Sequence, residues 1–180
     1  MESKPVLDLL NRSLELELSG VVRYTHYSLM VYGYNRIPIV SWLRAQAQSS
    51  LEHAQEVGEL VTHFGEHPSL AIGPLLETYN HDIGDILRES MEHEAESLEL
   101  YRKLLKKVVG KSILLEEFAR KMIAEEEQHL GEVDKMLRTP GDIAAFAGEK
   151  KSTKARESDD GRATRSSRSG RARGRAARSR

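Results

Sequence analysis

Long stretches of this chain keep apolar side chains on one face of a helix, and the residues that break helices lie between the stretches. Apolar residues recur at steps of three and four through residues 4–138, which matches the period of an α-helix. The breaks are marked by glycine and proline, at Gly33, Pro38, Gly65, Pro68 and Gly110. The pattern predicts four helices, at about 4–32, 38–65, 76–109 and 112–138. We therefore expect an all-α fold.

The lengths of the three connections predict how the helices are arranged. The first and third connections are short, which makes the helices on either side of them antiparallel hairpins. The second, residues 66–75, contains Pro68, Gly73 and Pro74 and spans roughly 33 Å when fully extended. Helices of this length are roughly 45 Å long, so the connection can follow most of the bundle. We predict a four-helix bundle with one long crossover, with a simple up-down-up-down bundle as the alternative.

Charge divides the chain into two parts. Residues 149–180 hold 12 basic and 4 acidic side chains, a net charge of +8, which leaves −9 for residues 1–148. The last 20 residues contain eight arginines and no large apolar side chain. We therefore predict a folded domain at 1–148 and a disordered, arginine-rich tail at 149–180. Such a tail favours contact with DNA or RNA phosphates. Two alternatives are a solubilising appendage and contact with the acidic body of a neighbouring subunit.

Composition excludes several kinds of chemistry. The chain has no cysteine, which removes thiolate catalysis, iron–sulfur clusters and zinc–thiolate sites, so metal ligands must come from His, Glu and Asp. Mean hydropathy is −0.52, and no apolar run approaches the ~20 residues of a membrane helix. The first residues do not have the layout of a secretory signal. We expect a soluble, cytoplasmic protein with no membrane contact.

Carboxylates and histidines interrupt the apolar faces of all four predicted helices. Each occupies a position where the helical period expects an apolar side chain. They are Glu17, His53, Glu94, Glu126 and His129. Burying a lone carboxylate costs several kcal/mol unless a cation or hydrogen bonds compensate it. The three inward carboxylates and two imidazoles therefore predict a metal site.

The spacing of these residues strengthens the prediction. Glu17 precedes His53 by 36 residues, and Glu94 precedes His129 by 35, so the two hairpins form pseudo-repeats. Tyr24 and Tyr101 each follow a glutamate of the set by seven residues. They are either core aromatics or residues that support the site or donate electrons to it. Di-iron and di-manganese bundles use this combination of Glu and Glu-x-x-His ligands.

These motifs resemble the bacterioferritin branch of the ferritin-like superfamily over about residues 5–139. The matching segments are Leu10-Asn11 through Glu17 to Tyr24, Leu51-Glu52-His53-Ala54, Leu87-Arg88 through Glu94, and Glu125-Glu126-Glu127-Gln128-His129. The resemblance implies that the five residues ligate two metal ions, with Glu126 bridging them. It further implies oxidation of Fe(II) by dioxygen or hydrogen peroxide, and homo-oligomers that form 24-subunit shells and store the ferric product.

Two positions depart from the family pattern. Ser50 lies three residues before His53, where the family has a second bridging glutamate, so we expect weaker or asymmetric metal binding. Glu56 is the first candidate to replace that carboxylate, and Glu52 is the second. Leu51 lies where bacterioferritins have a haem-ligating methionine, so haem is not expected.

Two other functions remain open at this stage. A di-manganese or di-iron enzyme that disproportionates hydrogen peroxide would use the same ligand types. A DNA-associating or structural bundle with a degenerate metal site would explain Ser50 together with the basic tail. The remaining histidines have no partner at a convincing spacing and are interpreted as surface or packing residues; they are His26, His63, His67, His81 and His93.

Overall fold

The computed structural model describes residues 3–144, and the fold of this part is all-α, as predicted. The predicted tail at 149–180 lies outside the described residues. Four long helices follow one another along the chain: α1 (Lys4–Met30), α2 (Arg36–His63), α3 (Ile83–Val108) and α4 (Ile113–Leu137). No helix within the described part combines the length and the apolar character needed to cross a membrane.

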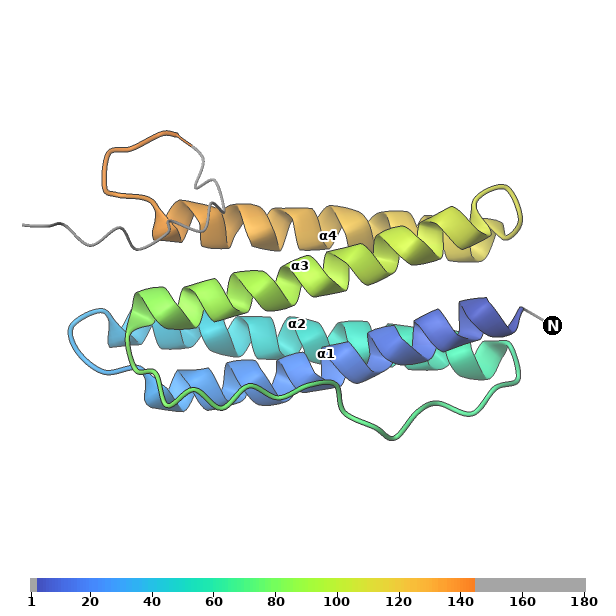
Figure 1. The fold of residues 1–180 in the computed structure, drawn as a ribbon, viewed down its shortest axis with the longest axis horizontal. Helices are drawn as coiled ribbons and strands as arrows, with labels where there is room; N and C mark the ends of the chain where they lie inside the picture. Colours follow the sequence, from blue (N-terminus) through green and yellow to red (C-terminus); the bar gives the residue numbers. More distant parts are fainter. Residues whose placement is uncertain (1–2, 145–180) are drawn as a thin grey trace, which may run out of the picture. The chain divides into compact units, whose positions relative to one another are not determined.

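The helices form the predicted bundle with one long crossover (Figure 1). Helix α1 packs against α2, α3 packs against α4, and α1 also packs against α3. The connection between α2 and α3 runs back along α1, so α2 and α3 point in the same direction (Figure 1). The simple up-down-up-down alternative is therefore wrong.

The crossover is longer than predicted, because α3 begins at Ile83 rather than near residue 76. The Asp82 side chain caps the helix by accepting a hydrogen bond from the Asp85 backbone N–H at 3.1 Å. Before it, Leu75 and Leu76 are 56% and 42% exposed, so no core contact draws these residues into a helix. The apolar pattern after Pro74 therefore extended the predicted helix too far.

Close contacts hold the crossover against α1. The Gly73 N–H donates to the Glu15 carbonyl at 2.7 Å, and a Cβ at Gly73 would lie 3.0 Å from that oxygen. A glycine is therefore required for so close an approach. The Ser69 N–H donates to Asn11 Oδ1 at 2.8 Å.

The bundle core is apolar towards both ends and polar in the middle. One apolar cluster includes Leu10, Val57 and Leu115, and the other includes Val31 and Leu43. Between them the buried residues include serines, carboxylates and histidines from all four helices. A row of polar groups that interrupts the core in this way costs stability unless each group is paired.

Candidate metal centre

The structure brings together the five residues that the sequence pointed to. Glu17 comes from α1, His53 from α2, Glu94 from α3, and Glu126 and His129 from α4. His129 is the most exposed of them, at 20% of its side chain. The other four are at most 6% exposed. Each helix therefore contributes at least one inward polar group at the same level of the bundle.

The five side chains form two clusters that share one carboxylate. His53 Nδ1 lies 3.6 Å from Glu17 Oε2 and 3.4 Å from Glu126 Oε1. His129 Nδ1 lies 3.7 Å from Glu94 Oε2 and also 3.7 Å from Glu126 Oε2. Within each cluster, one candidate ligand atom per residue lies within 4.8 Å of the others. Glu126 belongs to both clusters, which is the position of a bridging group.

Electrostatics at the site favour bound positive charge. Burial alone would lower the pKa of His53, but Glu126 and Glu17 outweigh it and raise the pKa to about 10. The neighbouring carboxylates of Glu126 and Glu94 raise the pKa of His129 to about 10, against the effect of burial. Protons on the two imidazoles therefore balance the carboxylates when no metal is bound.

The carboxylates of Glu126 and Glu94 have different proton affinities. Burial raises the pKa of Glu126 above its ordinary value, although both histidines oppose this change. Burial has the same tendency at Glu94, but its neighbours His129 and Glu126 and the hydrogen bond from Tyr24 overcome it and lower the pKa. The shared carboxylate is thus the one that holds a proton more readily.

Two buried tyrosines hold the carboxylates of Glu94 and Glu17, each tyrosine reaching from one helix to the glutamate of the other. The Tyr24 hydroxyl on α1 donates to Glu94 Oε1 on α3. The Tyr101 hydroxyl on α3 donates to Glu17 Oε1 on α1 at 2.8 Å. Burial, and then the neighbouring carboxylates, raise the pKa of both tyrosines well above the usual value. Both hydroxyls thus remain protonated donors that fix the carboxylates.

Ser50 is buried beside α1, and no carboxylate of α2 replaces the one missing from its position. A Cβ on Gly20 would lie 2.6 Å from Ser50 Oγ and 2.8 Å from His93 Nε2, so Ser50 and His93 approach the same notch in α1. His93 is 3% exposed, and its Nδ1 accepts a hydrogen bond from Arg23 at 3.1 Å. Of the two interpretations from the sequence, surface or packing residue, His93 is therefore a packing residue.

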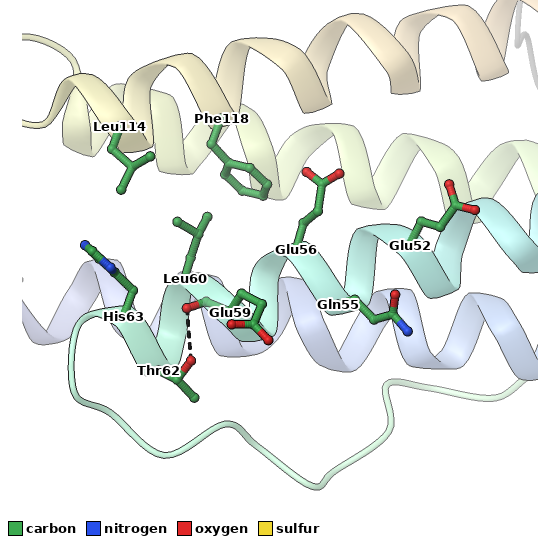
Figure 2. Close-up of a pocket in the computed structure, with 9 residues that line it drawn as sticks. All are labelled: Glu52, Gln55, Glu56, Glu59, Leu60, Thr62, His63, Leu114 and Phe118. Carbon is green, nitrogen blue, oxygen red and sulfur yellow. Dashed lines mark hydrogen bonds between the residues drawn. The ribbon is translucent and has the colours of Figure 1, made fainter.

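Glu56 lies outside the two clusters. Its carboxylate oxygens lie 2.6 and 2.7 Å from the Lys121 ammonium, and 43% of its side chain is exposed. Together with Glu52 it lines an open groove of about 950 Å³ between α2 and α4. Figure 2 shows these two side chains on α2, and Leu114 and Phe118 on α4. The expectation that Glu56 supplies the missing carboxylate does not agree with this geometry.

One carboxylate close to the site was missed in the sequence. Glu125 Oε2 lies 3.1 Å from His53 Nε2, on the opposite side of the ring from Glu17 and Glu126. Glu125 directly precedes Glu126 in an acidic run, so its spacing along α4 did not distinguish it from exposed neighbours such as Glu127. The relative rotation of α2 and α4 would have been needed to identify it.

Comparisons with known proteins identify the family and the fold of the bundle. The family model of the ferritin-like domain matches residues 7–140. No curated protein matches the chain in sequence. Among solved structures, a ferritin-like, diiron-carboxylate protein from Bacillus anthracis str. Ames has a TM-score of 0.72 and 23% identity, covering 77% of this chain and 100% of its own.

Two further solved structures have the same fold. A bacterioferritin from Rhodobacter capsulatus, solved with a metal-free dinuclear site and haem iron, gives a TM-score of 0.67 and 19% identity, covering 76% of this chain and 85% of its own. A dodecameric thioferritin, the bacterioferritin-related protein from Bacteroides fragilis, gives a TM-score of 0.69 and 20% identity, and the match covers 76% of this chain and 86% of its own.

Proposed function

The chain belongs to the ferritin-like family, and we propose that it binds two iron ions in each subunit and oxidises Fe(II) there with dioxygen or hydrogen peroxide. The observation that carries this proposal is the pair of carboxylate–histidine clusters that share Glu126. A bridging carboxylate flanked by two imidazoles is the arrangement that dinuclear bundles use. Manganese is the other metal that these donors accept.

The residues at the site fit such a metal pair. Glu126 Oε2 is buried, and no group of the described residues lies within hydrogen-bond distance of it, since His129 Nδ1 is 3.7 Å away. A carboxylate oxygen in this position is costly unless a cation relieves it. Carboxylate oxygens and imidazole nitrogens suit Fe(II) and Mn(II). Glu17 and His53 would hold one ion, Glu94 and His129 the other, and Glu126 both. Fe(II) held there would be the electron donor, and dioxygen or hydrogen peroxide would accept its electrons.

The surrounding side chains orient the carboxylates and limit access of water. Tyr101 holds one oxygen of Glu17, and Ser97 Oγ donates to the same oxygen at 3.0 Å. These donors leave Glu17 Oε2 directed to the cluster with His53. The apolar clusters on either side of the polar layer bury it. The carboxylates therefore lie in a medium of low dielectric constant, where the attraction between a carboxylate and a cation is stronger than in water.

We further propose that the chain assembles into a homo-oligomeric shell that stores the ferric product, because a single bundle encloses no space for a mineral. Large apolar side chains are exposed on α1 and the crossover, among them Leu29 at 59%, Leu70 at 94% and Tyr79 at 77%. Exposed apolar surface of this kind favours association. Light scattering of the purified protein distinguishes shells of 24 subunits from smaller ones.

Oxygen consumption on addition of Fe(II) tests the oxidation. We expect consumption with ferric absorbance in the wild type, and the loss of both in Glu94→Ala with His129→Ala. Glu127→Ala is the matched control, because this exposed carboxylate pairs with Arg102 at 2.8 Å and lies outside both clusters. Unchanged oxidation in the double variant would overturn the proposal. Oxygen release from hydrogen peroxide, with no ferric build-up, would favour the peroxide-disproportionating alternative.

A further inference from the structure

The two histidines of the candidate metal centre have different surroundings on their outer sides. Both turn Nδ1 towards the shared carboxylate Glu126, and their rings are stacked with centroids 6.1 Å apart. His53 Nε2 contacts Glu125 Oε2 at 3.1 Å and Ser49 Oγ at 3.5 Å. For His129 Nε2, the described part of the chain provides no hydrogen-bond partner. Only one of the two imidazoles therefore has a carboxylate behind it.

The pseudo-repeat of the two hairpins explains where this difference comes from. Glu125 and Glu126 precede His129 by four and three residues on α4, and Ser49 and Ser50 precede His53 by four and three residues on α2. Helix α4 thus carries carboxylates at both positions, whereas α2 carries hydroxyls at both. The position on α2 that matches Glu125 is occupied by Ser49, whose short side chain contacts His53 instead.

A carboxylate behind a ligating imidazole has a specific chemical effect. To bind a cation through Nδ1, His53 must carry its ring proton on Nε2, and Glu125 is placed to accept that proton's hydrogen bond. Such a bond fixes the tautomer and ring orientation and increases the basicity of the ligand. Glu125 is 37% exposed and His53 is 7% exposed by side chain, so the contact lies where a carboxylate is still partly solvated.

We propose that Glu125 is the positioning residue for His53. The inference rests on the proposed function, since it assigns Glu125 a role in binding one of the two metal ions. Glu125 acts through the ring of His53, because it lies behind Nε2 while the other carboxylates lie before Nδ1. The metal held by His53 is therefore the one that depends on Glu125.

Titration of the metal-free full-length protein with Co(II), followed by visible absorption, tests this role. We expect two binding steps in the wild type. Glu125→Ala should weaken one step about 10- to 100-fold and change its absorption band, while the other step is unchanged. Glu125→Gln keeps a hydrogen-bond acceptor but loses the charge, so its Co(II) affinity at this step should lie between those of the wild type and Glu125→Ala. Glu127→Ala is the matched control and should leave both steps unchanged.

A double-mutant cycle with His53→Ala separates positioning from a general effect on folding. Once His53 is absent, Glu125→Ala should have no further effect on Co(II) binding. Two unchanged steps in Glu125→Ala would overturn the inference while leaving the proposed function intact. The inference would also be wrong if the effect persisted in the His53→Ala background, or if both steps weakened together with the melting temperature. Failure of the wild type to bind two equivalents would overturn the proposed function itself.

Discussion

Metal binding at the candidate centre should depend steeply on pH, because protons and cations compete for the same imidazoles. With the pKa of His53 and His129 raised to about 10, both rings carry the extra proton at pH 7 when no metal is bound. Each ring must lose that proton before Nδ1 can bind a cation. Filling the centre should therefore release about two protons from the imidazoles and a fraction of one from Glu126, whose pKa burial raises to about 7. Above that pKa, the product of the two binding constants should rise about 100-fold per pH unit, or ~2.7 kcal/mol.

Calorimetric titration with Co(II) measures this proton release directly. Titrations at one pH in buffers with different protonation enthalpies give the number of protons released, which we expect to lie between two and three near pH 7. His129→Ala should reduce this number by about one. His63→Ala, which removes an exposed histidine of the α2–α4 groove, should not change it. If the heat did not depend on the buffer, no proton would leave the site on binding, and the protonation of His53 and His129 in the metal-free protein would be wrong.

The stability of the metal-free protein should change with pH in the opposite sense. A histidine whose pKa is raised on folding stabilises the folded state fully below its unfolded pKa of about 6.5. This contribution is lost as the pH rises towards the folded value of about 10. Metal-free protein should thus melt at a lower temperature at pH 10 than at pH 6. An equal or higher melting temperature at pH 10 would contradict the raised values.

Two further predictions concern single residues, and a third concerns the segment 149–180. Tyr101→Phe removes the 2.8 Å hydrogen bond to Glu17 but leaves the one from Ser97, so we expect a loss of about 1.5 kcal/mol and a melting temperature lower by about 4 °C in circular dichroism. Ser50→Glu restores a carboxylate three residues before His53, and titration should show about ten-fold tighter binding of the weaker metal ion, with lower metal-free stability. Deletion of residues 149–180 should leave melting and Fe(II) oxidation unchanged while abolishing salt-sensitive retention of DNA.

Each of these predictions has a matched comparison. Tyr27→Phe removes the hydroxyl of another buried tyrosine, which donates to Glu89 at 2.9 Å outside the metal centre, so it should leave metal binding unchanged, whereas Tyr101→Phe should weaken it. Gln48→Glu adds a carboxylate on the exposed side of α2, two residues from Ser50, and should not reproduce the effect of Ser50→Glu on metal binding. A tail of equal length with its arginines replaced by serine separates charge from length. DNA retention that survives in the serine variant would show that arginine is not its source.

The sequence was sufficient to identify residues that meet in the core, because helical periodicity fixes which face of a helix each residue occupies. Glu17 and Glu94 occupy core positions in their stripes, and both are buried at the same level of the bundle. The pseudo-repeat added the pairing of these glutamates with His53 and His129. These inferences needed only the register within each helix.

Features that depend on contacts between helices could not be obtained in the same way. The choice between Glu56 and Glu125 depends on how α2 is rotated relative to α4, and a salt bridge to Lys121 holds Glu56 at the surface. The crossed bonds from Tyr24 to Glu94 and from Tyr101 to Glu17 also require three dimensions. The start of α3 at Ile83 was missed because the cap at Asp82 outweighs the apolar residues that precede it.

In the proposed centre, Glu126 links two metal ions that are held by different helices. Anomalous X-ray diffraction from crystals soaked in Fe(II) under anaerobic conditions locates such ions. We expect two anomalous peaks in each subunit, one beside Glu17 and His53 and the other beside Glu94 and His129, with Glu126 contacting both. A single peak, or peaks that lie away from Glu126, would contradict this arrangement.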